Sequence, residues 1–311
     1  MTLAISLLSF TEQLKWVQER VNKILLHKFQ RLPNHQSKLI RAMQYSTLIG
    51  GKRIRPFLIY IIGNMLNISI KNLDIPAAAI ECIHTYSLIH DDLPAMDNGI
   101  YRRGKHTCHL IFDEAHAILA GDALHALAFE MLSNSTMPDI NDSNKLTIIN
   151  ELAHAIGASG MCGGQALDIE SIHQEINVEK LNFIYFNKTG ALIRAAIKIC
   201  IIAANIQNCA LSSLLETYAN TFGLLFQIKD DLKDYQKDKC NIKQQNFSNT
   251  SSKLKTYPTL IGIKKTNRKI TDLYHIALKT LEKLENIHGI NTTTLQNLTH
   301  FIAKKNIPQN M

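Results

Sequence analysis

The chain has little glycine and proline, 14 and 7 residues out of 311, and it lacks a series of segments in which apolar and polar residues alternate. These absences argue against a sheet-rich fold, whose strands show that alternation. Apolar residues make up 46% of the sequence, which excludes a disordered chain and predicts a sizeable helical core. No apolar run approaches the length of a transmembrane helix, so we expect no membrane span.

Cysteine is also scarce, and the six cysteines form no C-x-x-C pair and no zinc-like spacing. Scattered thiols are typical of a reducing compartment, so we expect a cytoplasmic protein. The net charge of +8 is compatible with nucleic acid, acidic lipid or a small anionic substrate. Because no basic run with interleaved aromatic residues occurs, we expect no nucleic-acid partner.

Apolar residues recur with a helical period through most of the sequence. The clearest segments are 12–30, 76–93, 111–132, 147–160, 179–204, 211–232 and 268–285. Neither an internal repeat nor a clean linker separates them, so we predict an all-α fold with a single domain over 1–311. Residues 133–146 and 286–294 are expected to be connections, and the polar stretch 239–255 a mobile loop.

Two prolines set expected helix boundaries. Pro76 fits the first turn of its helix, where a missing amide proton costs little. Pro94 disfavours helical geometry in the residue before it, so that helix is predicted to end near Asp92 or Leu93.

Three carboxylates, Asp91, Asp92 and Asp97, cluster at that helix end in the segment HDDLPAMDN. The negative end of a helix dipole disfavours clustered anions, so cations are needed to neutralise them. Mg²⁺, which prefers oxygen ligands, is one candidate. The alternative is a solvated acidic turn paired with Arg102 and Arg103.

A second acidic cluster lies far downstream in FQIKDDLKDY. Asp230 and Asp234 are four residues apart and share a helix face, with Gln227 one turn earlier, and Asp231 flanks this stripe. Two such clusters predict two sets of carboxylates that hold a diphosphate through several Mg²⁺ ions, whose charge stabilises a departing pyrophosphate. A solvent-facing charged helix is the alternative.

The segment GGKRIRPF combines two glycines with Lys52, Arg53 and Arg55. Glycine lets the backbone approach an anion and arginine binds phosphate through parallel hydrogen bonds, which predicts a second diphosphate site. A glycine turn beside solvated cations is the alternative. His84 lies seven residues before Asp91, two helical turns along nearly the same stripe, so it can project toward the same cavity. A lone histidine is, however, more often structural.

Two further segments contain candidate ligands. GMCGGQALDIE places Gln165 and Asp168 three residues apart after closely spaced glycines, which suit either a ligand or close helix packing. NKTGALI places Lys188 and Thr189 within a helical pattern, where Lys188 either meets a phosphate or lies at the surface.

The motifs follow one another in a set order: GGKRIRPF, ECIHTYSLIHDDLPAMD, RRGKHTCH, AILAGDAL, GMCGGQALDI, KTGALI, FQIKDD and TYPTLIG. Together they resemble the trans-prenyl diphosphate synthases, most closely the bacterial members of that family that make farnesyl diphosphate. The resemblance runs from about Leu48 to Gly262. It implies an all-α prenyl synthase fold with helices around a deep central cavity, usually as a homodimer.

The resemblance also implies roles for individual residues. Six aspartates match those that bind Mg²⁺ and the allylic diphosphate: Asp91, Asp92, Asp97, Asp230, Asp231 and Asp234. All of these except Asp231 are expected to be Mg²⁺ ligands. Four side chains match positions that hold isopentenyl diphosphate: Lys52, Arg55, His84 and Arg103. Six more match positions near the allylic substrate or the metal shell: Arg102, Lys188, Thr189, Gln227, Gln165 and Asp168.

The family pattern is not followed everywhere. Asn98, Gly99 and Ile100 stand where the family often has further acids, and its two loop lysines fall on Gln244 and Leu254. Lysines lie beside both positions. The tail KKNIPQNM replaces the basic tail of close relatives.

An aromatic residue at the position of Tyr86 is associated in that family with products of fifteen carbons, because the ring blocks the growing chain. Tyr86 lies five residues before Asp91, about 7.5 Å deeper along a helix that rises 1.5 Å per residue. Ser87, four residues before Asp91, is more nearly aligned with it, so Ser87 is a second candidate for the residue that limits chain length, and helix geometry alone does not choose between the two. A ring that only fills a helix interface is the alternative for Tyr86.

With the resemblance, these patterns predict a Mg²⁺-dependent transferase that joins isopentenyl diphosphate to dimethylallyl and then geranyl diphosphate, giving (2E,6E)-farnesyl diphosphate. A geranylgeranyl diphosphate synthase of the same family and a non-catalytic modulatory subunit of a partner synthase are alternatives. A class I terpene cyclase also uses an aspartate-rich motif, but such enzymes usually carry an Asn/Ser/Glu-type second motif instead of the aspartates found here.

Overall fold

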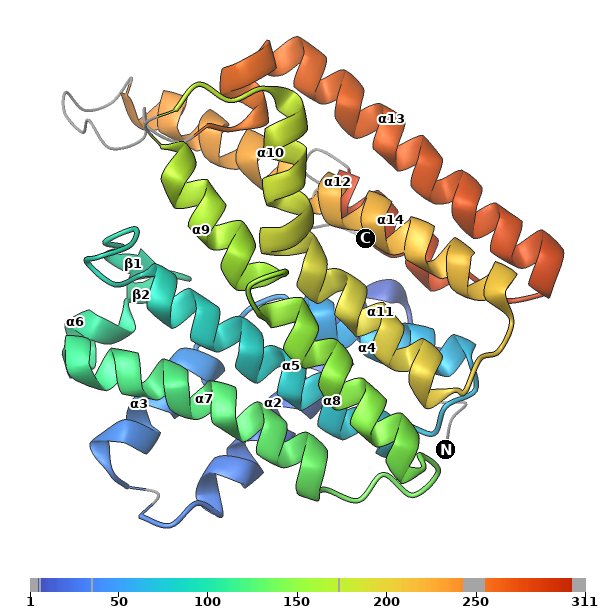
Figure 1. The fold of residues 1–311 in the computed structure, drawn as a ribbon, viewed down its shortest axis with the longest axis horizontal. Coiled ribbons are helices and arrows are strands. Elements are labelled where there is room, and N and C mark those ends of the chain that lie inside the picture. Colours follow the sequence, from blue (N-terminus) through green and yellow to red (C-terminus); the bar gives the residue numbers. More distant parts are fainter. Residues whose placement is uncertain (1–4, 6, 35, 173, 243–254, 304–311) are drawn as a thin grey trace. The chain divides into compact units, whose positions relative to one another are not determined.

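The computed structural model describes residues 5, 7–34, 36–172, 174–242 and 255–303. Apart from a two-stranded antiparallel hairpin, the elements in these ranges are helices, which confirms the predicted all-α fold (Figure 1). The chain forms two compact units: unit 1 with Met1–Leu152 and Ile199–Asn205, and unit 2 with Ala153–Lys198 and Ile206–Met311. A single domain over 1–311 stays a prediction.

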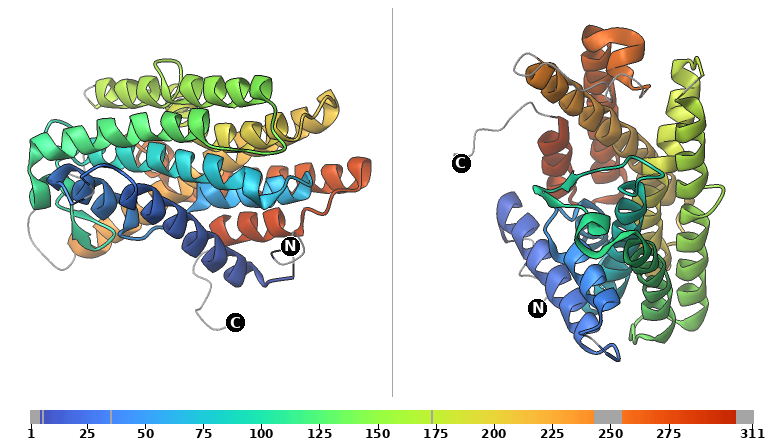
Figure 2. Two further views of the ribbon diagram at one scale, coloured as in Figure 1. Left: turned by 90° about the horizontal axis from the view of Figure 1, so that it is seen from below. Right: turned by 90° about the vertical axis from the view of Figure 1, so that its left-hand side faces the viewer.

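Unit 1 is organised around one buried helix. The elements that begin in it are α2 (Phe10–Gln30), α3 (Lys38–Leu48), α4 (Ile54–Met65), α5 (Ile70–Asp91), β1 (Tyr101–Arg102), β2 (Lys105–His106), α6 (Cys108–Phe112), α7 (Glu114–Asn134) and α8 (Asp142–Ile156). Helices α2, α4 and α7 pack against α5, which Figure 2 shows from two further directions. Consecutive buried residues such as Ala78, Ala79 and Ile80 lie on different sides of α5, as expected for a helix enclosed by others.

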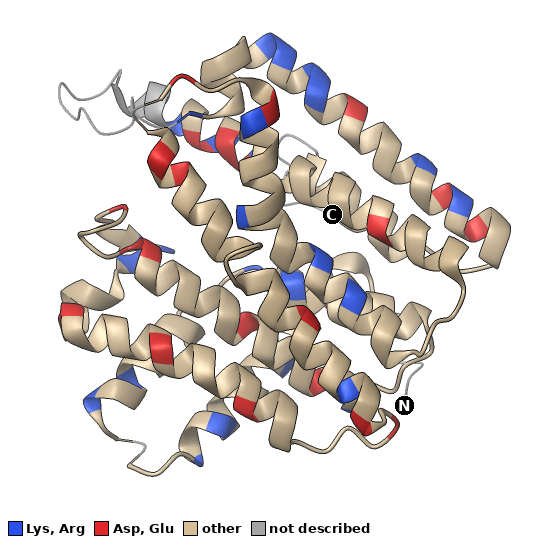
Figure 3. Cartoon of the chain, in the orientation of Figure 1, with Lys and Arg blue, Asp and Glu red and all other residues tan. Residues whose placement is uncertain are grey.

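Unit 2 is organised around the long helix α12. The elements that begin in it are α9 (Met161–Ser171), α10 (Val178–Tyr185), the π-helix η1 (Phe186–Gly190), α11 (Ala191–Ala203), α12 (Cys209–Ile242), α13 (Tyr257–His288) and α14 (Thr293–Ala303). Helix α12 packs against α13, η1 and α14, with Phe222, Leu281 and Leu298 in the core. Basic and acidic residues are interspersed along α13, which is typical of a solvated helix face (Figure 3).

The start of α5 differs from the prediction. The helix begins at Ile70, so Pro76 lies inside it and not in its first turn. The expected start was wrong because the polar residues Asn72 and Asp74 interrupt the apolar pattern, although both are hydrogen-bonded in the folded unit. The C-terminal end at Asp91 agrees with the boundary predicted from proline.

Three other boundaries also differ. The predicted helix over 111–132 is divided at Asp113, which has a φ of 91° and caps the amide end of α7 with its side chain. Helix α8 begins at Asp142, inside a segment expected to be a connection. Residues 239–242 continue α12, whereas the rest of the predicted loop, 243–254, lies outside the described residues. In the part of the chain that is described, no helix has the length and apolar composition needed to span a membrane.

Candidate active site

The glycine turn before α4 and the β1–β2 hairpin meet at one contact. Gly50 and Gly51 have φ values of 110° and 125°, which glycine adopts readily. A Cβ on Gly51 would lie 2.5 Å from Cζ of Arg103, so only glycine lets this arginine close on the turn, where its Nη1 donates to the Gly50 carbonyl oxygen. Lys52 on the same turn is exposed, and Arg55 in the first turn of α4 is half-buried. The contact therefore gathers cations from two distant segments.

The first aspartate cluster occupies the C-terminal end of α5. Asp92 is buried, and its Oδ2 accepts a hydrogen bond from Nε of Arg102 at 3.1 Å. The amide of Asp97 donates to the carbonyl oxygen of Asp91 at 2.9 Å, which folds the loop back onto the helix end. Asp91 is half-buried and Asp97 is exposed. Arg102 thus pairs with this cluster as the acidic-turn alternative predicts, whereas Arg103 turns to Gly50.

His84 faces the same group of cations. Burial lowers the pKa of its imidazole well below the ordinary value, and the positive charges of Arg55 and Arg103 lower it further. These charges act on His84 from α4 and from the hairpin. The structure therefore unites the predicted residues of three segments in one positively charged region that keeps His84 neutral.

Tyr86 lies at the interface of α5 and α7. Its ring stacks on His125 with 5.0 Å between centroids and meets His90 edge-on at 5.7 Å. The hydroxyl of Ser87 donates to the carbonyl oxygen of His84 at 2.9 Å. Tyr86 thus makes the interface contacts of the packing alternative, and its role in chain length stays a prediction.

The second aspartate cluster lies on α12 in unit 2. Asp231 is buried, its Oδ1 accepts from Nε2 of Gln227 at 2.9 Å, and its Oδ2 accepts from the Tyr185 hydroxyl. Burial raises the pKa of Asp231 to about 6, although both hydrogen bonds oppose that shift. Asp230 is half-buried and Asp234 is exposed. The three aspartates of this motif therefore have different surroundings.

The amide of Gln227 is held at both of its ends. Thr189 Oγ1 donates to Oε1 of Gln227 at 2.6 Å, while Nε2 of Gln227 donates to Asp231. Thr189 belongs to the π-helix η1, a type of segment that is frequent at functional sites. Thr189 and Gln227, both expected near the allylic substrate or the metal shell, are thus in direct contact.

Lys188 and Asp168 are joined by an ion pair between η1 and α9. Nζ of Lys188 lies 2.6 Å from Oδ2 of Asp168. The two elements approach closely because a Cβ on Gly164 would lie only 2.2 Å from the amide nitrogen of Lys188. The closely spaced glycines therefore serve helix packing, one of the two interpretations, and Gln165 is half-buried on the same helix.

The predicted residues form two groups, one in each unit. Unit 1 contains Lys52, Arg55, His84, Tyr86, Ser87, Asp91, Asp92, Asp97, Arg102 and Arg103; unit 2 contains Gln165, Asp168, Lys188, Thr189, Gln227, Asp230, Asp231 and Asp234. That the two aspartate clusters face each other stays a prediction. Gln244, Leu254 and the tail KKNIPQNM lie outside the described residues.

Sequence reasoning missed two residues that support these groups, Glu81 and Tyr185, and it was wrong about the role of Arg53. Arg53 was expected among the phosphate-binding cations of the glycine turn, but it is buried and donates to Glu81. The Tyr185 hydroxyl donates to Asp231. Glu81 gave a usable signal, because a single acid inside an apolar helical run needs a buried partner. Tyr185 gave none, since its partner is 46 residues away.

The donor set fits Mg²⁺. This ion prefers oxygen ligands and is usually held by one or two carboxylates together with substrate phosphates and water. Among the described residues, no three or more His, Cys, Asp or Glu side chains gather closely enough to hold a metal ion by themselves. Asp91 with Asp97, and Asp230 with Asp234, suit the sparse mode in which phosphate oxygens complete the coordination.

Comparison with known proteins agrees with this arrangement. The model of the polyprenyl synthetase family matches residues 36–291. Farnesyl diphosphate synthase of Escherichia coli is 42% identical over 96% of this chain and 100% of the relative, and that of Haemophilus influenzae is 45% identical over 95% and 98%. A crystal structure of a geranyltransferase from Legionella pneumophila has a TM-score of 0.83 and 34% identity, covering 94% of this chain and 96% of that one.

The fold and the two aspartate clusters thus define an all-helical protein of the isoprenoid synthase type. More particularly, the chain belongs to the polyprenyl synthetase family. This confirms the resemblance found in the sequence motifs.

Proposed function

We propose that the chain is a transferase that makes (2E,6E)-farnesyl diphosphate by condensing isopentenyl diphosphate with dimethylallyl and then with geranyl diphosphate. The observation that carries this is the 42% identity to a farnesyl diphosphate synthase over that relative's full length, with both aspartate motifs complete. The cation cluster of unit 1 and the hydrogen-bonded network of unit 2 support it.

Isopentenyl diphosphate is held by the cations of unit 1 in this proposal. Lys52 and Arg55 flank the glycine turn, and Arg103 is fixed to that turn through Gly50. Arginine forms two parallel hydrogen bonds to phosphate, and lysine adds a point charge. His84 stays neutral beside these arginines, so it contributes a hydrogen bond and no further positive charge.

Asp91, Asp92 and Asp97, together with Asp230 and Asp234, would hold Mg²⁺ beside the allylic diphosphate. The bound metal would supply positive charge that neutralises a departing pyrophosphate. Lys188 adds a cation that Asp168 keeps in place at 2.6 Å. We assign Asp231 to positioning, because both of its oxygens already accept hydrogen bonds from Gln227 and Tyr185.

Oriented dipoles in unit 2 stabilise the allylic cation. Thr189 donates its hydroxyl proton to Gln227, so the lone pairs of Thr189 Oγ1 are available to face positive charge. Because Asp231 fixes the other end of Gln227, these dipoles need little reorganisation during the reaction. The double bond of isopentenyl diphosphate then attacks the cation, a carbon–carbon bond forms, and a proton passes to the released pyrophosphate.

A homodimer and a single domain over 1–311 complete the proposal. Four large apolar side chains on α6 and α7 are exposed, namely Leu110, Ile111, Ile118 and Leu119, and a protein contact would cover such side chains. Sedimentation of the wild type is compared with that of Ile118→Lys/Leu119→Lys to test the dimer.

The proposal also includes a cytoplasmic location, which the scattered cysteines support.

One assay tests the function. Purified protein is incubated with radiolabelled isopentenyl diphosphate and each allylic primer in turn, and products are separated by chain length. Fifteen-carbon product supports the proposal, and twenty-carbon product supports the geranylgeranyl alternative. No elongation with any primer would leave the non-catalytic subunit as the better account, and a cyclic hydrocarbon from a single substrate would indicate a terpene cyclase.

A further inference from the structure

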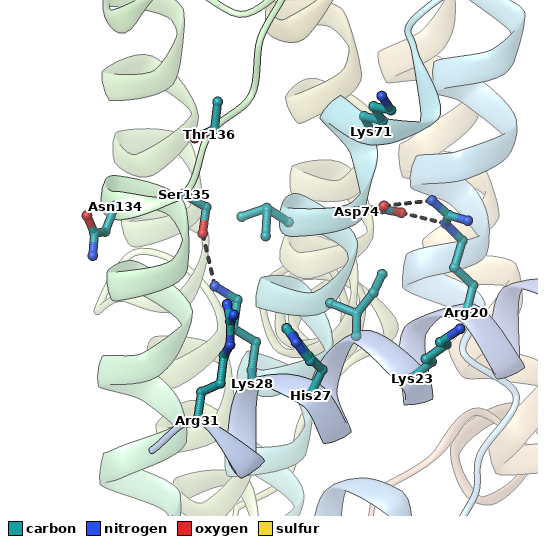
Figure 4. Close-up of a pocket in the computed structure, with 12 residues that line it drawn as sticks. Arg20, Lys23, His27, Lys28, Arg31, Lys71, Asp74, Asn134, Ser135 and Thr136 are labelled. Carbon is teal, nitrogen blue, oxygen red and sulfur yellow. Dashed lines mark hydrogen bonds and ion pairs between the residues drawn. The ribbon is translucent and has the colours of Figure 1, made fainter. Parts of the chain in front are cut away.

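A basic cavity of ≈ 680 Å³ lies in unit 1, lined by residues outside the candidate active site (Figure 4). Its walls come from α2, from the first turns of α5 and from the end of α7. Five fixed cations and one histidine line it: Arg20, Lys23, Lys28, Arg31, Lys71 and His27. No residue of either aspartate cluster or of the glycine turn takes part.

The periodicity of α2 produces this basic wall. The helix buries Val17, Val21, Leu25 and Phe29, which lie four residues apart along one stripe, and so turns its other positions outward. Among those positions, Lys23, His27 and Arg31 again lie four apart and share a face. Lys28 and Arg31 lie three residues apart and place like charges next to each other, and an anion bound against them would relieve their repulsion.

The cavity contains a single carboxylate, and a lining arginine already engages it. Asp74 accepts from Nε and Nη2 of Arg20 at 2.6 and 2.7 Å. Lys28 donates to the uncharged Ser135 hydroxyl at 3.2 Å. Within the described ranges, no ion pair is formed by Lys23, His27, Arg31 or Lys71. The lining therefore has a formal net charge of +4 when only Lys, Arg and Asp are counted, and Figure 4 shows its basic side chains around one space.

We propose that this cavity binds a small molecule that carries two or more linked phosphates. Lys and Arg hold phosphate oxygens through charge-assisted hydrogen bonds. A lining charge of +4 exceeds what one phosphate of about −2 neutralises, which favours linked phosphates. The volume lies within the range of about 300–1,000 Å³ that is usual for small-molecule sites.

The cavity also has room for an organic group beside the phosphates. Ile24 and Ile75 contribute apolar surface, and Asn134 and Thr136 contribute amide and hydroxyl groups. A recess with walls from three elements suits a compact ligand better than it suits a flat membrane. Because none of the lining residues belongs to the candidate active site, binding here does not depend on the proposed reaction.

Trp16 provides a local reporter of binding. It is the only tryptophan in the sequence, and the guanidinium carbon of the cavity residue Arg20 lies 5.2 Å from the centroid of its ring. Tripolyphosphate, which does not absorb in the range of tryptophan emission, is titrated into the full-length protein at about 0.1 M salt, where screening still allows short-range pairing. A saturable change in fluorescence is expected, with orthophosphate at least about tenfold weaker. Equal affinity for orthophosphate would overturn the requirement for linked phosphates.

A double variant with one substitution on each of two walls, compared with a control variant outside the cavity, locates the site. Lys23→Gln/Lys71→Gln removes two exposed cations and is expected to weaken tripolyphosphate binding by about a hundredfold, about tenfold for each charge-assisted contact. Lys15→Gln, also exposed and on α2 but outside the cavity, should bind as the wild type does. Circular dichroism and melting temperature verify that all variants fold, as expected for exposed substitutions. An unchanged affinity in the double variant, or the same loss in Lys15→Gln, overturns the proposal.

Tripolyphosphate can also bind in the candidate active site. A third variant distinguishes binding there from binding in the cavity. Arg55→Ala should keep the Trp16 signal, and a signal lost in Arg55→Ala but kept in Lys23→Gln/Lys71→Gln would overturn the proposal. Calorimetry with ATP distinguishes the sources of the phosphates: tighter binding than tripolyphosphate points to a nucleotide, and equal binding to the phosphate chain alone. Tighter binding of a single-stranded RNA oligonucleotide than of either probe would replace the small ligand by nucleic acid.

Discussion

Arg53 and Glu81 form an ion pair whose side chains are 0% and 1% exposed. Nη1 of Arg53 donates to Oε1 of Glu81, and Nη2 donates to Oδ1 of Asn22 at 2.7 Å. Arg53 also has a left-handed backbone, with a φ of 51°, at the start of α4. The pair therefore joins the glycine turn to the central helix α5. It also fixes the position of the backbone that carries the neighbouring side chains of Lys52 and Arg55.

Glu81→Leu should lower the free energy of unfolding by about 3–5 kcal/mol, because it leaves the Arg53 guanidinium buried without its carboxylate. Urea unfolding measures the loss. The matched double variant Arg53→Met/Glu81→Leu should recover most of it, since no charge is then left buried. A single variant within about 0.5 kcal/mol of the wild type would show that the pair adds no stability.

His84 should make the protein less stable as the pH falls. Burial, with the charges of Arg55 and Arg103, lowers the pKa of its imidazole in the folded state, so the unfolded chain takes up a proton first. The contribution of His84 to the free energy of unfolding is complete above the pKa of about 6.5 that a histidine has in the unfolded chain. It is lost as the pH falls from there toward the lower pKa of the folded state. Urea unfolding between about pH 7.5 and 5.5 should give a steeper decline for the wild type than for His84→Gln. Parallel declines would contradict this account.

Removal of Mg²⁺ should abolish the condensation. EDTA is expected to stop turnover and added Mg²⁺ to restore it, and Asp91→Ala or Asp230→Ala should each lower kcat by about a thousandfold or more, since several kcal/mol of charge stabilisation disappear. Asp272→Ala, an exposed aspartate on α13, is the control and should be unaffected. Near-normal turnover in either variant would show that the substituted cluster is not needed, and it would contradict the proposal that both clusters bind the metal.

Lys52 and Arg55 should act on one substrate only. Replacing either with Ala is expected to raise the KM for isopentenyl diphosphate by about tenfold or more, with little effect on the KM for the allylic partner. Steady-state kinetics with each substrate varied in turn provide the measurement, with Lys15→Ala as the control. Equal effects on both KM values would give these residues a structural role.

Local patterns explain which parts were predictable from the sequence. The period of α12 and the spacing of its aspartates are properties of adjacent residues, so both could be predicted. The hydrogen bonds of Arg53 with Glu81 and of Tyr185 with Asp231 join residues 28 and 46 positions apart, and they depend on which helices pack together. Sequence patterns do not contain that information.

The backbone at Asp113 illustrates the same limit at shorter range. A positive φ of 91° is uncommon for a residue with a Cβ, and no glycine or proline marks the break between α6 and α7. The side chain of Asp113 stabilises the break by accepting from the amide of His116 at 2.8 Å. An apolar pattern that continues across such a break predicts one helix where the structure has two.

Product length is expected to depend on Tyr86. The ring is buried between α5 and α7, stacked on His125 at 5.0 Å, and it lies more than one turn before Asp91. If the hydrocarbon tail extends along α5 from Asp91, this buried ring can block it about 7.5 Å deeper along the helix. Ser87 lies nearer to the line of Asp91 but has a small side chain whose hydroxyl is bonded to His84.

Tyr86→Ala should therefore yield products of twenty carbons or more while the first condensation proceeds, because a ring is replaced by space into which the tail can extend. Removing a buried aromatic ring also costs about 3–5 kcal/mol of stability, so the assay is run well below the melting temperature of the variant. Ser87→Ala, one residue along the same helix, is the matched control and should still stop at fifteen carbons. Chromatography of the dephosphorylated products gives the chain lengths. A folded Tyr86→Ala variant that elongates geranyl diphosphate but stops at fifteen carbons would show that another residue forms the floor of the cavity.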